Sequence, residues 1–369
     1  MQSALAEGVF PGAVVFVRSR GQIAYHRAFG QAANIPLPEP ASIRTIYDLA
    51  SLTKPLATAT ALVCLAQDSR LDLTMPVQAV LHELKDSLVG RATVGHLLSH
   101  RSGLPAWRPY YEQIAKSDRA ALGSPESGAG QGALRLIREE PLEGAIGAQA
   151  RYSDLGFMLL GFLIVRLSGQ SLAHFCRDRV YAPLGIDDLF FIRSSGSPVG
   201  AAGESHVDPG RIAPTEDDPW RGRLLRGEVH DENAFALGGV AGHSGLFGTA
   251  AAVAQVSQCW LDAFLGRESI LSSKWVRRFI EHPDRSATGS WVHGWDTPSI
   301  PSSSGAYFSP ASFGHLGFTG TSLWVDPRAE LEVVLLSNRV HPTRKNEAIR
   351  GFRPKIHDVI YQEFAGRSG

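Results

Sequence analysis

The stretch that decides the fold is YDLASLTKPLATATALVCLAQ, residues 47–67, where a serine and a lysine stand three residues apart before a run of small apolar side chains. Residues three apart on a helix share one face, so the Ser51 hydroxyl and the Lys54 amine can come within hydrogen-bonding reach. Serine is a weak nucleophile until a base takes its proton, and lysine can be that base only if its surroundings lower its pKa from ~10.4. The pair predicts a nucleophilic serine or, alternatively, an ordinary turn of a core helix.

The residues after Lys54 predict a buried helix. Apolar side chains occupy most positions of 56–66, so the helix has little polar face. Pro55 is tolerated only in the first turn, and the helix is therefore expected to begin close to Ser51. Its N–H groups and the positive end of its dipole would then lie beside the serine, where they favour a developing oxyanion.

The composition is that of a globular protein without net charge. The chain has 369 residues, 44% of them hydrophobic, and 36 Lys and Arg balance 36 Asp and Glu. This balance lacks the signature of nucleic-acid binding, so a small-molecule or peptide substrate is expected, while the oligomeric state stays open. The longest apolar run, 156–165, is too short to span a bilayer, and the N-terminus does not resemble a signal peptide. We therefore expect no membrane segment and a cytoplasmic location, or a periplasmic or secreted one if a signal peptide was removed.

No metal or cofactor site is predicted. The three cysteines lie far apart with no C-x-x-C spacing, which argues against a zinc site or a disulfide framework. His96 and His100 are four residues apart, but no glutamate follows His96, so packing and capping is the favoured interpretation. The polar run 230–233 is interpreted as a hydrogen-bonded turn. No G-x-S-x-G motif is present, which excludes the nucleophile elbow of an α/β-hydrolase.

Strands are predicted at both ends of the chain and helices between them. Alternating residues on both sides of Arg20-Gly21 predict one hairpin, and 321–325 with 331–337 predict another. Helical spacing or composition marks 55–67, 93–99, 155–168, 171–182 and 250–265. Stretches rich in Gly, Pro and Ser are expected to be surface loops: 117–132, 193–222 and 298–306.

This arrangement predicts an α/β (α+β) fold. An antiparallel sheet built from both chain termini would be flanked by helices such as the one at KIHDVIYQEF, and an all-α subdomain would be inserted. We expect one catalytic unit, 1–369, with a sheet part formed by 1–50 and 300–369 and a mainly helical part formed by 51–299.

Two further motifs follow the Ser51 motif in chain order. RYSDLGFMLLG supplies Tyr152 before an apolar helix, and GHLGFTGTSLWVDP supplies His315 and Gly317 before a strand. With SxxK, Yx(N/D) and HxG in this order, the sequence resembles the serine β-lactamase and penicillin-binding protein superfamily, specifically its class C β-lactamase-like branch. The resemblance runs through nearly the whole chain, including LLSHRSGLP and VVLLSNRVHPTR. It implies a β-lactamase/transpeptidase-like fold and a serine hydrolase that works through an acyl-enzyme without a cofactor.

The resemblance also implies a role for each matching residue. Ser51 would be the acylated nucleophile, Lys54 its proton partner and Tyr152 the general base or acid. Tyrosine has an ordinary pKa of ~10, so a phenolate would need nearby cations, and the choice between Lys54 and Tyr152 as the acylation base stays open. The backbone N–H groups of Ser51 and Phe318 would form the oxyanion hole.

Two residues depart from the family's commonest pattern. Asp154 stands where asparagine is commonest, and an ionised aspartate beside Lys54 would hold the ammonium form. His315 stands where lysine is commonest, beside Gly317 on the sheet edge that faces the nucleophile. A histidine protonated near pH 6 would select more strongly for carboxylate-bearing leaving groups than a neutral one at pH 8. A second HxG at His243 ranks behind His315, because it leads into a helical run and is better interpreted as a loop near the site.

Two further stretches of sequence bear on the substrate. The stretches VHDENAFALGGVAGHSGLF and LLSNRVHPTR look most like the branch that contains muramyl-L-alanine amidases. That resemblance implies a peptidoglycan-derived peptide, cleaved by a muropeptide amidase or a peptidase of the D-amino type. The alternatives are a carboxylesterase with weak β-lactamase activity and, from another class, a non-catalytic penicillin-binding scaffold.

Overall fold

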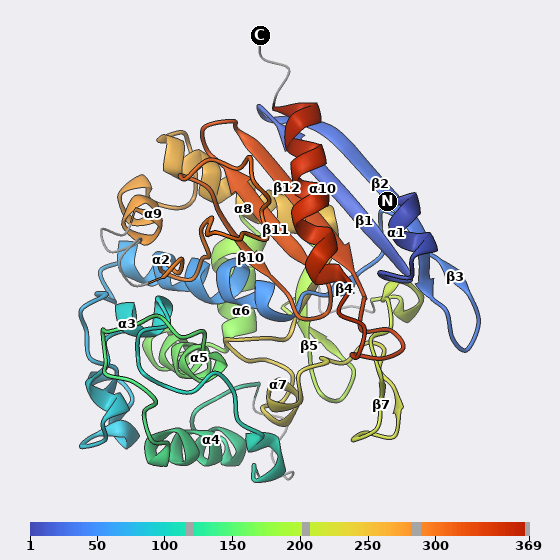
Figure 1. Cartoon of the computed structure of the whole chain (residues 1–369). Helices are drawn as coiled ribbons and strands as arrows, with labels where there is room; N and C mark the ends of the chain where they lie inside the picture. The colour runs from blue at the N-terminus through green and yellow to red at the C-terminus, as the bar shows by residue number, and fades with distance from the viewer. Residues whose placement is uncertain (115–121, 201–206, 282–288, 366–369) are drawn as a thin grey trace.

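An antiparallel sheet of six strands forms the centre of the computed structural model, which describes residues 1–114, 122–200, 207–281 and 289–365. The strand order is β10-β11-β12-β1-β2-β3. N-terminal β1 pairs with C-terminal β12, with Val15 opposite Leu335, so the two ends of the chain close one sheet (Figure 1). The bounds are β1 (Gly12–Ser19), β2 (Gln22–Ala33), β3 (Glu39–Pro40), β10 (Phe313–Leu316), β11 (Ser322–Asp326) and β12 (Leu331–Ser337). Both predicted hairpins and the predicted fold class are confirmed.

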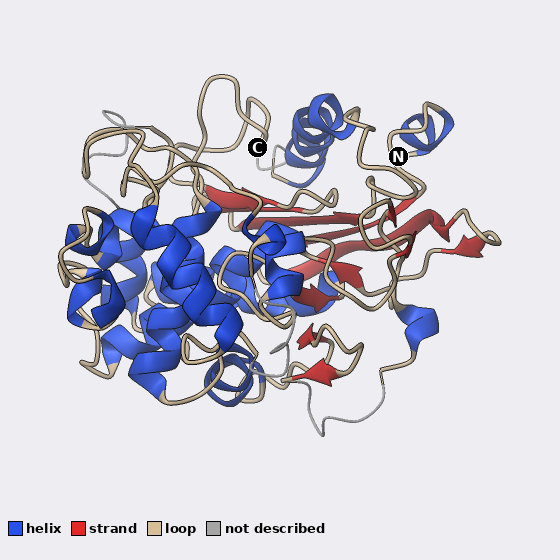
Figure 2. Cartoon of the chain, turned by 90° about the horizontal axis from the view of Figure 1, so that it is seen from below, coloured by secondary structure: helices blue, strands red, loops and turns tan. Residues whose placement is uncertain are grey.

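Helices cover both faces of this sheet. Figure 2 shows α10 (Ile349–Phe364) and α1 (Gln2–Ala6) on one side and the main helical body on the other. Successive side chains of a strand point to opposite faces. Val15 therefore joins the apolar cluster that includes residues of α10, while Val14 and Phe16 join the larger cluster on the other face. Because both faces are buried, β1 is apolar over most of its length.

The middle of the chain forms the helical body but also contains short strands that were not predicted. Its helices are α2 (Thr60–Gln67), α3 (Val94–Leu98), α4 (Gly128–Glu139), α5 (Asp154–Ser168), α6 (Leu172–Cys176), α7 (Glu232–Ala236), α8 (Ala250–Leu265) and α9 (Ser273–Ile280). A four-stranded sheet combines β4 (Tyr47–Asp48), β9 (Leu246–Gly248), β5 (Leu189–Ile192) and β6 (Pro198–Val199), and β7 (Asp217–Asp218) pairs with β8 (Arg223–Leu224). Strands of two to four residues carry too little alternation to be recognised in a sequence.

Three predicted segments differ from the structure in detail. The helix expected over 55–67 begins as a π-helical turn, Lys54–Ala59, before α2; Pro55 has no N–H to donate to an α-helical bond. The helix expected over 171–182 likewise ends in a π-helical turn, Arg177–Tyr181. The loop expected over 117–132 is wrong from Gly128, where α4 begins with Ser127 as its cap. Residues 117–121 of that loop, and 201–206 of the loop expected over 193–222, lie outside the described residues.

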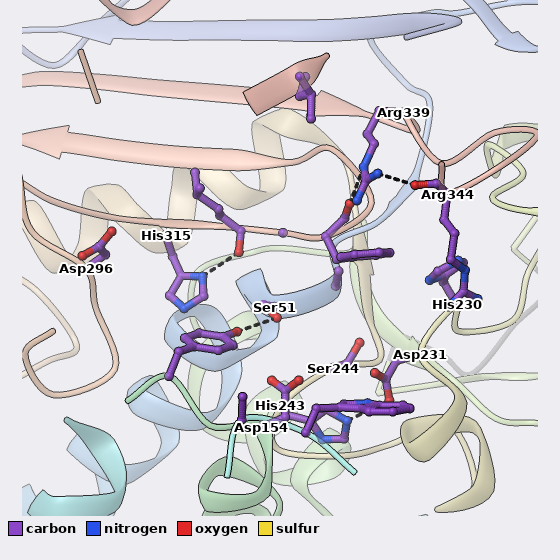
Figure 3. A pocket seen from close by; sticks show the side chains of 18 of the residues that line it. Ser51, Asp154, His230, Asp231, His243, Ser244, Asp296, His315, Arg339 and Arg344 are labelled. Carbon is purple, nitrogen blue, oxygen red and sulfur yellow. Dashed lines mark hydrogen bonds and ion pairs between the residues drawn. The ribbon is translucent and has the colours of Figure 1, made fainter. Parts of the chain in front are cut away.

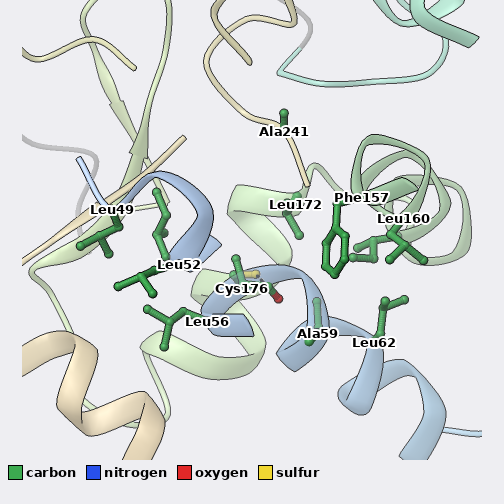
Figure 4. Packing of buried hydrophobic residues seen from close by; sticks show 14 of the residues in the cluster. Leu49, Leu52, Leu56, Ala59, Leu62, Phe157, Leu160, Leu172, Cys176 and Ala241 are labelled. Atoms are coloured by element: carbon green, nitrogen blue, oxygen red, sulfur yellow. Dashed lines mark hydrogen bonds between the residues drawn. The ribbon is translucent and has the colours of Figure 1, made fainter. Parts of the chain in front are cut away.

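The helix that follows Ser51 is buried on all sides, as expected. Figure 4 shows Ala59 and Leu62 beside Phe157 and Leu160 of α5, and Leu56 near Leu52 and Cys176. All of these residues are buried. Ser51 therefore lies at the N-terminal end of a close-packed helical segment that cannot shift without disturbing the core. The three cysteines are buried free thiols: Cys64, Cys176 and Cys259.

Across the part of the chain that the structure describes, no single helix has the length and apolar composition to cross a membrane. One bent pair, Asp154–Ser168 with Leu172–Tyr181, meets that test when its two members are taken together, at an angle of 71°.

Candidate active site

The backbone before Ser51 is held in a strained turn at the end of β4. Ala50 has a φ of 47°, a left-handed conformation that is unfavourable for a residue with a Cβ atom. The Asp48 carboxylate holds this turn, because Oδ1 accepts a hydrogen bond from Ala50 N at 2.8 Å and Oδ2 accepts one from His230 N at 2.7 Å. Ser51 follows in a 3-10 turn, Ala50–Leu52.

The Ser51 hydroxyl accepts hydrogen bonds from the two other side chains of the predicted catalytic set. Lys54 Nζ lies 2.9 Å from Ser51 Oγ, and the Tyr152 hydroxyl lies 2.8 Å from the same atom. The structure thus brings together the three residues selected from the sequence. These distances are short enough for direct proton transfer among the three groups.

Lys54 is fully buried, and its ammonium group has two hydrogen-bond acceptors and one ion-pair partner. Besides Ser51 Oγ, Nζ lies 3.0 Å from the carbonyl oxygen of His243 and 2.7 Å from Asp154 Oδ1. Burial by itself lowers the pKa of Lys54, but its interactions with Asp154, and next with Tyr152, together outweigh burial and raise this pKa above its usual value. Lys54 is therefore an ammonium in the resting protein, as expected from the presence of Asp154.

Tyr152 is held in place by aromatic packing and by the start of α5. Its ring centroid lies 4.6 Å from that of His100 and 5.1 Å from that of Trp291. His100 Nδ1 accepts a hydrogen bond from Ser153 N at 3.1 Å, which fixes the residue next to the tyrosine. Burial raises the pKa of Tyr152 to about 12, although the Lys54 charge opposes this rise. The resting side chain is therefore a neutral phenol.

His315 lies on β10, the edge strand of the six-stranded sheet. The HxG motif was expected just before a strand, but its histidine is already part of β10 and its glycine follows that strand. His315 Nδ1 lies 2.7 Å from the carbonyl oxygen of Leu316 and therefore carries the ring proton. Nε2 is buried without a partner among the described residues and can only accept a hydrogen bond. Burial, followed by the charge of Lys54, lowers the pKa of His315 to about 3. The expectation that His315 becomes protonated near pH 6 is wrong, because this site does not solvate the charge.

Gly317 follows β10 at a point of close backbone approach. A Cβ atom there would lie 2.5 Å from the carbonyl oxygen of Leu49 and would collide with Thr321 Oγ1. The Thr321 hydroxyl itself donates to Leu49 O at 3.1 Å. The turn after β10 is therefore docked directly on the backbone that leads into Ser51, which is why this position requires glycine.

Phe318 belongs to the same docked turn. The next residue, Thr319, donates its hydroxyl to the carbonyl oxygen of Asp48 at 2.7 Å, three residues before Ser51. The N–H of Phe318 has no acceptor among the described residues, and the residue lines the same cavity as Ser51. This N–H is thus available for an oxyanion, the role that the family resemblance predicts for it.

A cavity of about 630 Å³ opens at Ser51 between the sheet edge and the helical body (Figure 3). Sequence reasoning missed much of its lining. Trp107 and Trp291 supply apolar surface, and four arginines of the segment that follows β12 line it as well: Arg339, Arg344, Arg350 and Arg353. These residues come from loops and a terminal helix, where no periodic pattern marks a functional face.

Three residues of the run 230–233 also line the cavity: His230, Asp231 and Glu232. The run is therefore not the simple turn that was expected. Asp231 caps α7, because its Oδ1 accepts a hydrogen bond from Ala234 N at 2.7 Å. The same oxygen lies 2.8 Å from His243 Nε2. The second HxG therefore lies in a loop beside the site, as expected, although short strand β9 separates it from α8. The sheet-edge position belongs to His315.

The paired histidines have the capping and packing roles expected of them. His96 Nδ1 accepts a hydrogen bond from Thr93 N in the cap of α3, and the ring of His100 packs at a tilt against that of Tyr152. Within the described ranges, no cluster of three or more His, Cys, Asp or Glu side chains could hold a metal ion.

A serine contacted by a buried lysine and a tyrosine, in a cavity beside the edge of an antiparallel sheet, defines a serine hydrolase of the β-lactamase fold. The Beta-lactamase family model matches residues 1–354 of the chain. The chain therefore belongs to the beta-lactamase family of serine hydrolases.

A relative supports this membership, and solved structures share the fold. A protein of Escherichia coli O157:H7, provisionally named a D-alanyl-D-alanine carboxypeptidase, is 31% identical over 360 residues, which cover 90% of this chain and 79% of that protein. The structure of EstCE1, described as a hydrolase with promiscuous acyltransferase activity, gives a TM-score of 0.70 at 21% identity and covers 96% of both chains. The octameric penicillin-binding protein homologue from Pyrococcus abyssi gives 0.67 at 22% identity, with 96% of this chain and 75% of that chain covered. At such identities the two structures show the fold alone.

Proposed function

We propose that this protein is an amidase that cleaves a peptidoglycan-derived peptide through an acyl-enzyme on Ser51. The observation that carries the proposal is the position of Ser51 Oγ, 2.9 Å from Lys54 Nζ and 2.8 Å from the Tyr152 hydroxyl. An amide needs a proton on its leaving nitrogen as well as a nucleophile, and two proton-bearing groups beside one serine can supply both functions.

The reaction begins when the Lys54–Tyr152 pair has lost one proton. Ser51 Oγ attacks the amide carbonyl carbon while its proton passes to this pair, and a tetrahedral oxyanion forms that faces the N–H groups of Ser51 and Phe318. The pair then returns a proton to the leaving nitrogen, and the C–N bond breaks. Water then gives a proton to the same pair and attacks the ester carbonyl. As the C–O bond to Ser51 breaks, the pair returns this proton to Ser51 Oγ, which releases the acid and restores the form of the enzyme that lacks one proton.

The neutral state of His315 favours amide substrates whose leaving group has no carboxylate next to the bond that is cleaved. His315 Nε2 can accept a hydrogen bond from a substrate N–H group but offers no positive charge to an anion. This favours cleavage of the lactyl-to-L-alanine amide of a muramyl peptide over removal of a terminal D-alanine. The carboxypeptidase name of the Escherichia coli relative supports a cell-wall peptide as the substrate class.

The second candidate is a carboxylesterase with weak β-lactamase activity. The apolar surface that Trp107, Trp291 and Phe318 contribute to the cavity would suit a short acyl group or an aryl leaving group. Structural similarity to EstCE1 also favours this alternative.

A substrate panel tests the proposal against this alternative. We would measure kcat/KM of the wild-type protein for muramyl peptides, D-amino acid peptides and short nitrophenyl esters, with Ser51→Ala as the control for contaminating activity. The amidase proposal expects the highest kcat/KM for the muramyl amide. Rapid ester hydrolysis without cleavage of any amide would overturn it, and no turnover of any substrate would favour the non-catalytic scaffold.

A further inference from the structure

Arg353 is a buried cation that contacts the turn after β10. The residue lies on α10 and is 6% exposed. Its Nη2 donates to the carbonyl oxygens of Gly317 at 2.8 Å and of Thr321 at 2.7 Å. Among the described residues, no carboxylate forms an ion pair with this guanidinium.

A charge in this position is unfavourable by itself. Burial, and then the positive charges of Arg339 and Arg350, lower the pKa of Arg353 below its usual range. An uncompensated buried charge opposes folding unless something else in the protein uses it. Two neutral hydrogen-bond donors would hold the same turn without this penalty, so the charge itself requires an explanation.

The carbonyl of Gly317, which Arg353 contacts, belongs to the same peptide group as the proposed oxyanion donor, the N–H of Phe318. The carbonyl of Gly317 and the N–H of Phe318 are the two ends of one peptide group. A cation that binds the oxygen end withdraws electron density from the nitrogen and makes its N–H a stronger donor, since hydrogen bonds in a chain polarise one another. That N–H has no acceptor among the described residues and belongs to a residue that lines the cavity at Ser51.

We propose that Arg353 is a positioning residue that polarises the Gly317–Phe318 peptide, so that Phe318 N–H binds the oxyanion of the tetrahedral intermediate more tightly. The inference deepens the proposed function and rests on it, because it assumes an oxyanion at Ser51. Although Arg353 borders the cavity, its side chain is buried, and in this scheme it acts on the reaction only through one backbone amide.

The test measures how Arg353→Gln changes the affinity for a ligand that forms an anionic adduct and for one that does not, each relative to the wild-type protein. An arylboronic acid forms an anionic tetrahedral adduct with a reactive serine, whereas the uncleaved substrate binds without that charge. One oxyanion donor is worth ~10²–10³ in rate, so a donor weakened but not removed should cost about 10-fold in kcat and in boronate affinity. KM should stay within about twofold.

Arg339 provides a matched control. It is also buried and lies outside the ion pairs of the described residues, but its Nε donates at 2.8 Å to the carbonyl oxygen of Phe318, which belongs to the next peptide group. Arg339→Gln should therefore weaken boronate binding clearly less than Arg353→Gln. Thermal unfolding of each variant would show whether the fold is retained.

If Arg353→Gln lost as much affinity for the uncleaved substrate as for the boronate, Arg353 would be only structural. If Arg339→Gln lost as much boronate affinity as Arg353→Gln, the cause would be a general effect of charge. Either result overturns the inference. If Arg353→Gln does not fold, Arg353→Lys replaces it. The lysine side chain is shorter, so its ammonium lies farther from the Gly317 carbonyl than Nη2 does, and the change should cost about threefold in boronate affinity with an unchanged KM. An unaltered boronate affinity would again overturn the inference. Failure of the proposed function is a different result: a non-catalytic scaffold would form no boronate adduct in the wild-type protein, and an esterase would form the adduct but cleave no muramyl amide in the substrate panel.

Discussion

Lys54 Nζ lies 2.7 Å from Asp154 Oδ1, so the lysine of the Ser51 motif is paired with a carboxylate instead of standing alone in an apolar pocket. The carboxylate holds the ammonium form and also disfavours a phenolate on Tyr152, which lies two residues earlier. In the resting protein both neighbours of Ser51 are protonated. Activity therefore depends on the loss of one proton that Lys54 and Tyr152 share, which is a property of the pair and not of either residue.

Asp154→Asn should shift the pH dependence of the enzyme and leave its maximal rate largely intact. The Asp154 charge raises the pKa of both Lys54 and Tyr152, so its removal lowers both values. The form that lacks one proton is then reached at lower pH, and the rising limb of kcat/KM against pH moves down by about one unit. A pH–rate profile of both proteins would check this shift. An unmoved limb, or one displaced to higher pH, would show that Asp154 does not control the pair.

Tyr152→Phe should slow turnover without disturbing the fold. The phenol is lost while the ring keeps its contacts with His100 and Trp291, so only proton transfer is affected. General acid–base help is typically worth ~10²–10⁴, and we expect kcat to fall at least ~10²-fold. Lys54→Ala should be at least as damaging. A kcat near the wild-type value in steady-state assays of Tyr152→Phe would make Tyr152 a structural residue.

His315 should make substrate selection insensitive to pH between 6 and 8. Its pKa of about 3 keeps the imidazole neutral over this range, so it gains no attraction for carboxylates as the pH falls. The ratio of kcat/KM for matched substrates with and without a carboxylate should stay constant. His315→Lys would introduce a charge and raise that ratio. If the wild-type ratio increased clearly toward pH 6, the imidazole would be gaining a proton there and the neutral assignment would fail.

Gly317→Ala should separate the turn after β10 from the nucleophile. A methyl group at this position meets Leu49 O at 2.5 Å, so the turn must move away from the backbone that leads to Ser51. A misplacement of ~1 Å in an active site can cost ~10²-fold in rate, and we expect a loss of this order in kcat/KM. A matched change is Gly351→Ala in α10, where an added Cβ meets nothing within 4 Å. Similar activities in the two variants would show that the turn tolerates the displacement.

The sequence could predict those site residues that belong to short local motifs. Ser51 and Lys54 share one turn, and the fold places Tyr152 and the strand of His315 beside them. The protonation of His315 could not be predicted, because it follows from burial and from the carbonyl of Leu316, which depend on how β10 packs. The arginines after β12 were missed for a similar reason: a loop and a terminal helix bring them to the cavity, and nothing in their spacing marks that destination.

The same distinction applies to the fold. Long elements with clear periodicity, such as α5 and the terminal hairpins, were predicted well because their burial pattern is repeated over many residues. Strand β9 and the other strands of its small sheet were not predicted. They have two to four residues each, and their pairing partners are far away in the chain. Helix α4 begins with glycines, which disfavour helices, and is stabilised by its Ser127 cap and by tertiary packing.

The central claim is that Ser51 is the nucleophile, and intact-mass spectrometry with peptide mapping after reaction with a fluorophosphonate probe tests it most directly. The account predicts a single adduct on the peptide that contains Ser51, absent from Ser51→Ala although that variant remains folded. Slower labelling of Lys54→Ala would connect the reactivity to its proton partner. An adduct on any other residue, or unchanged labelling of Ser51→Ala, would contradict the account.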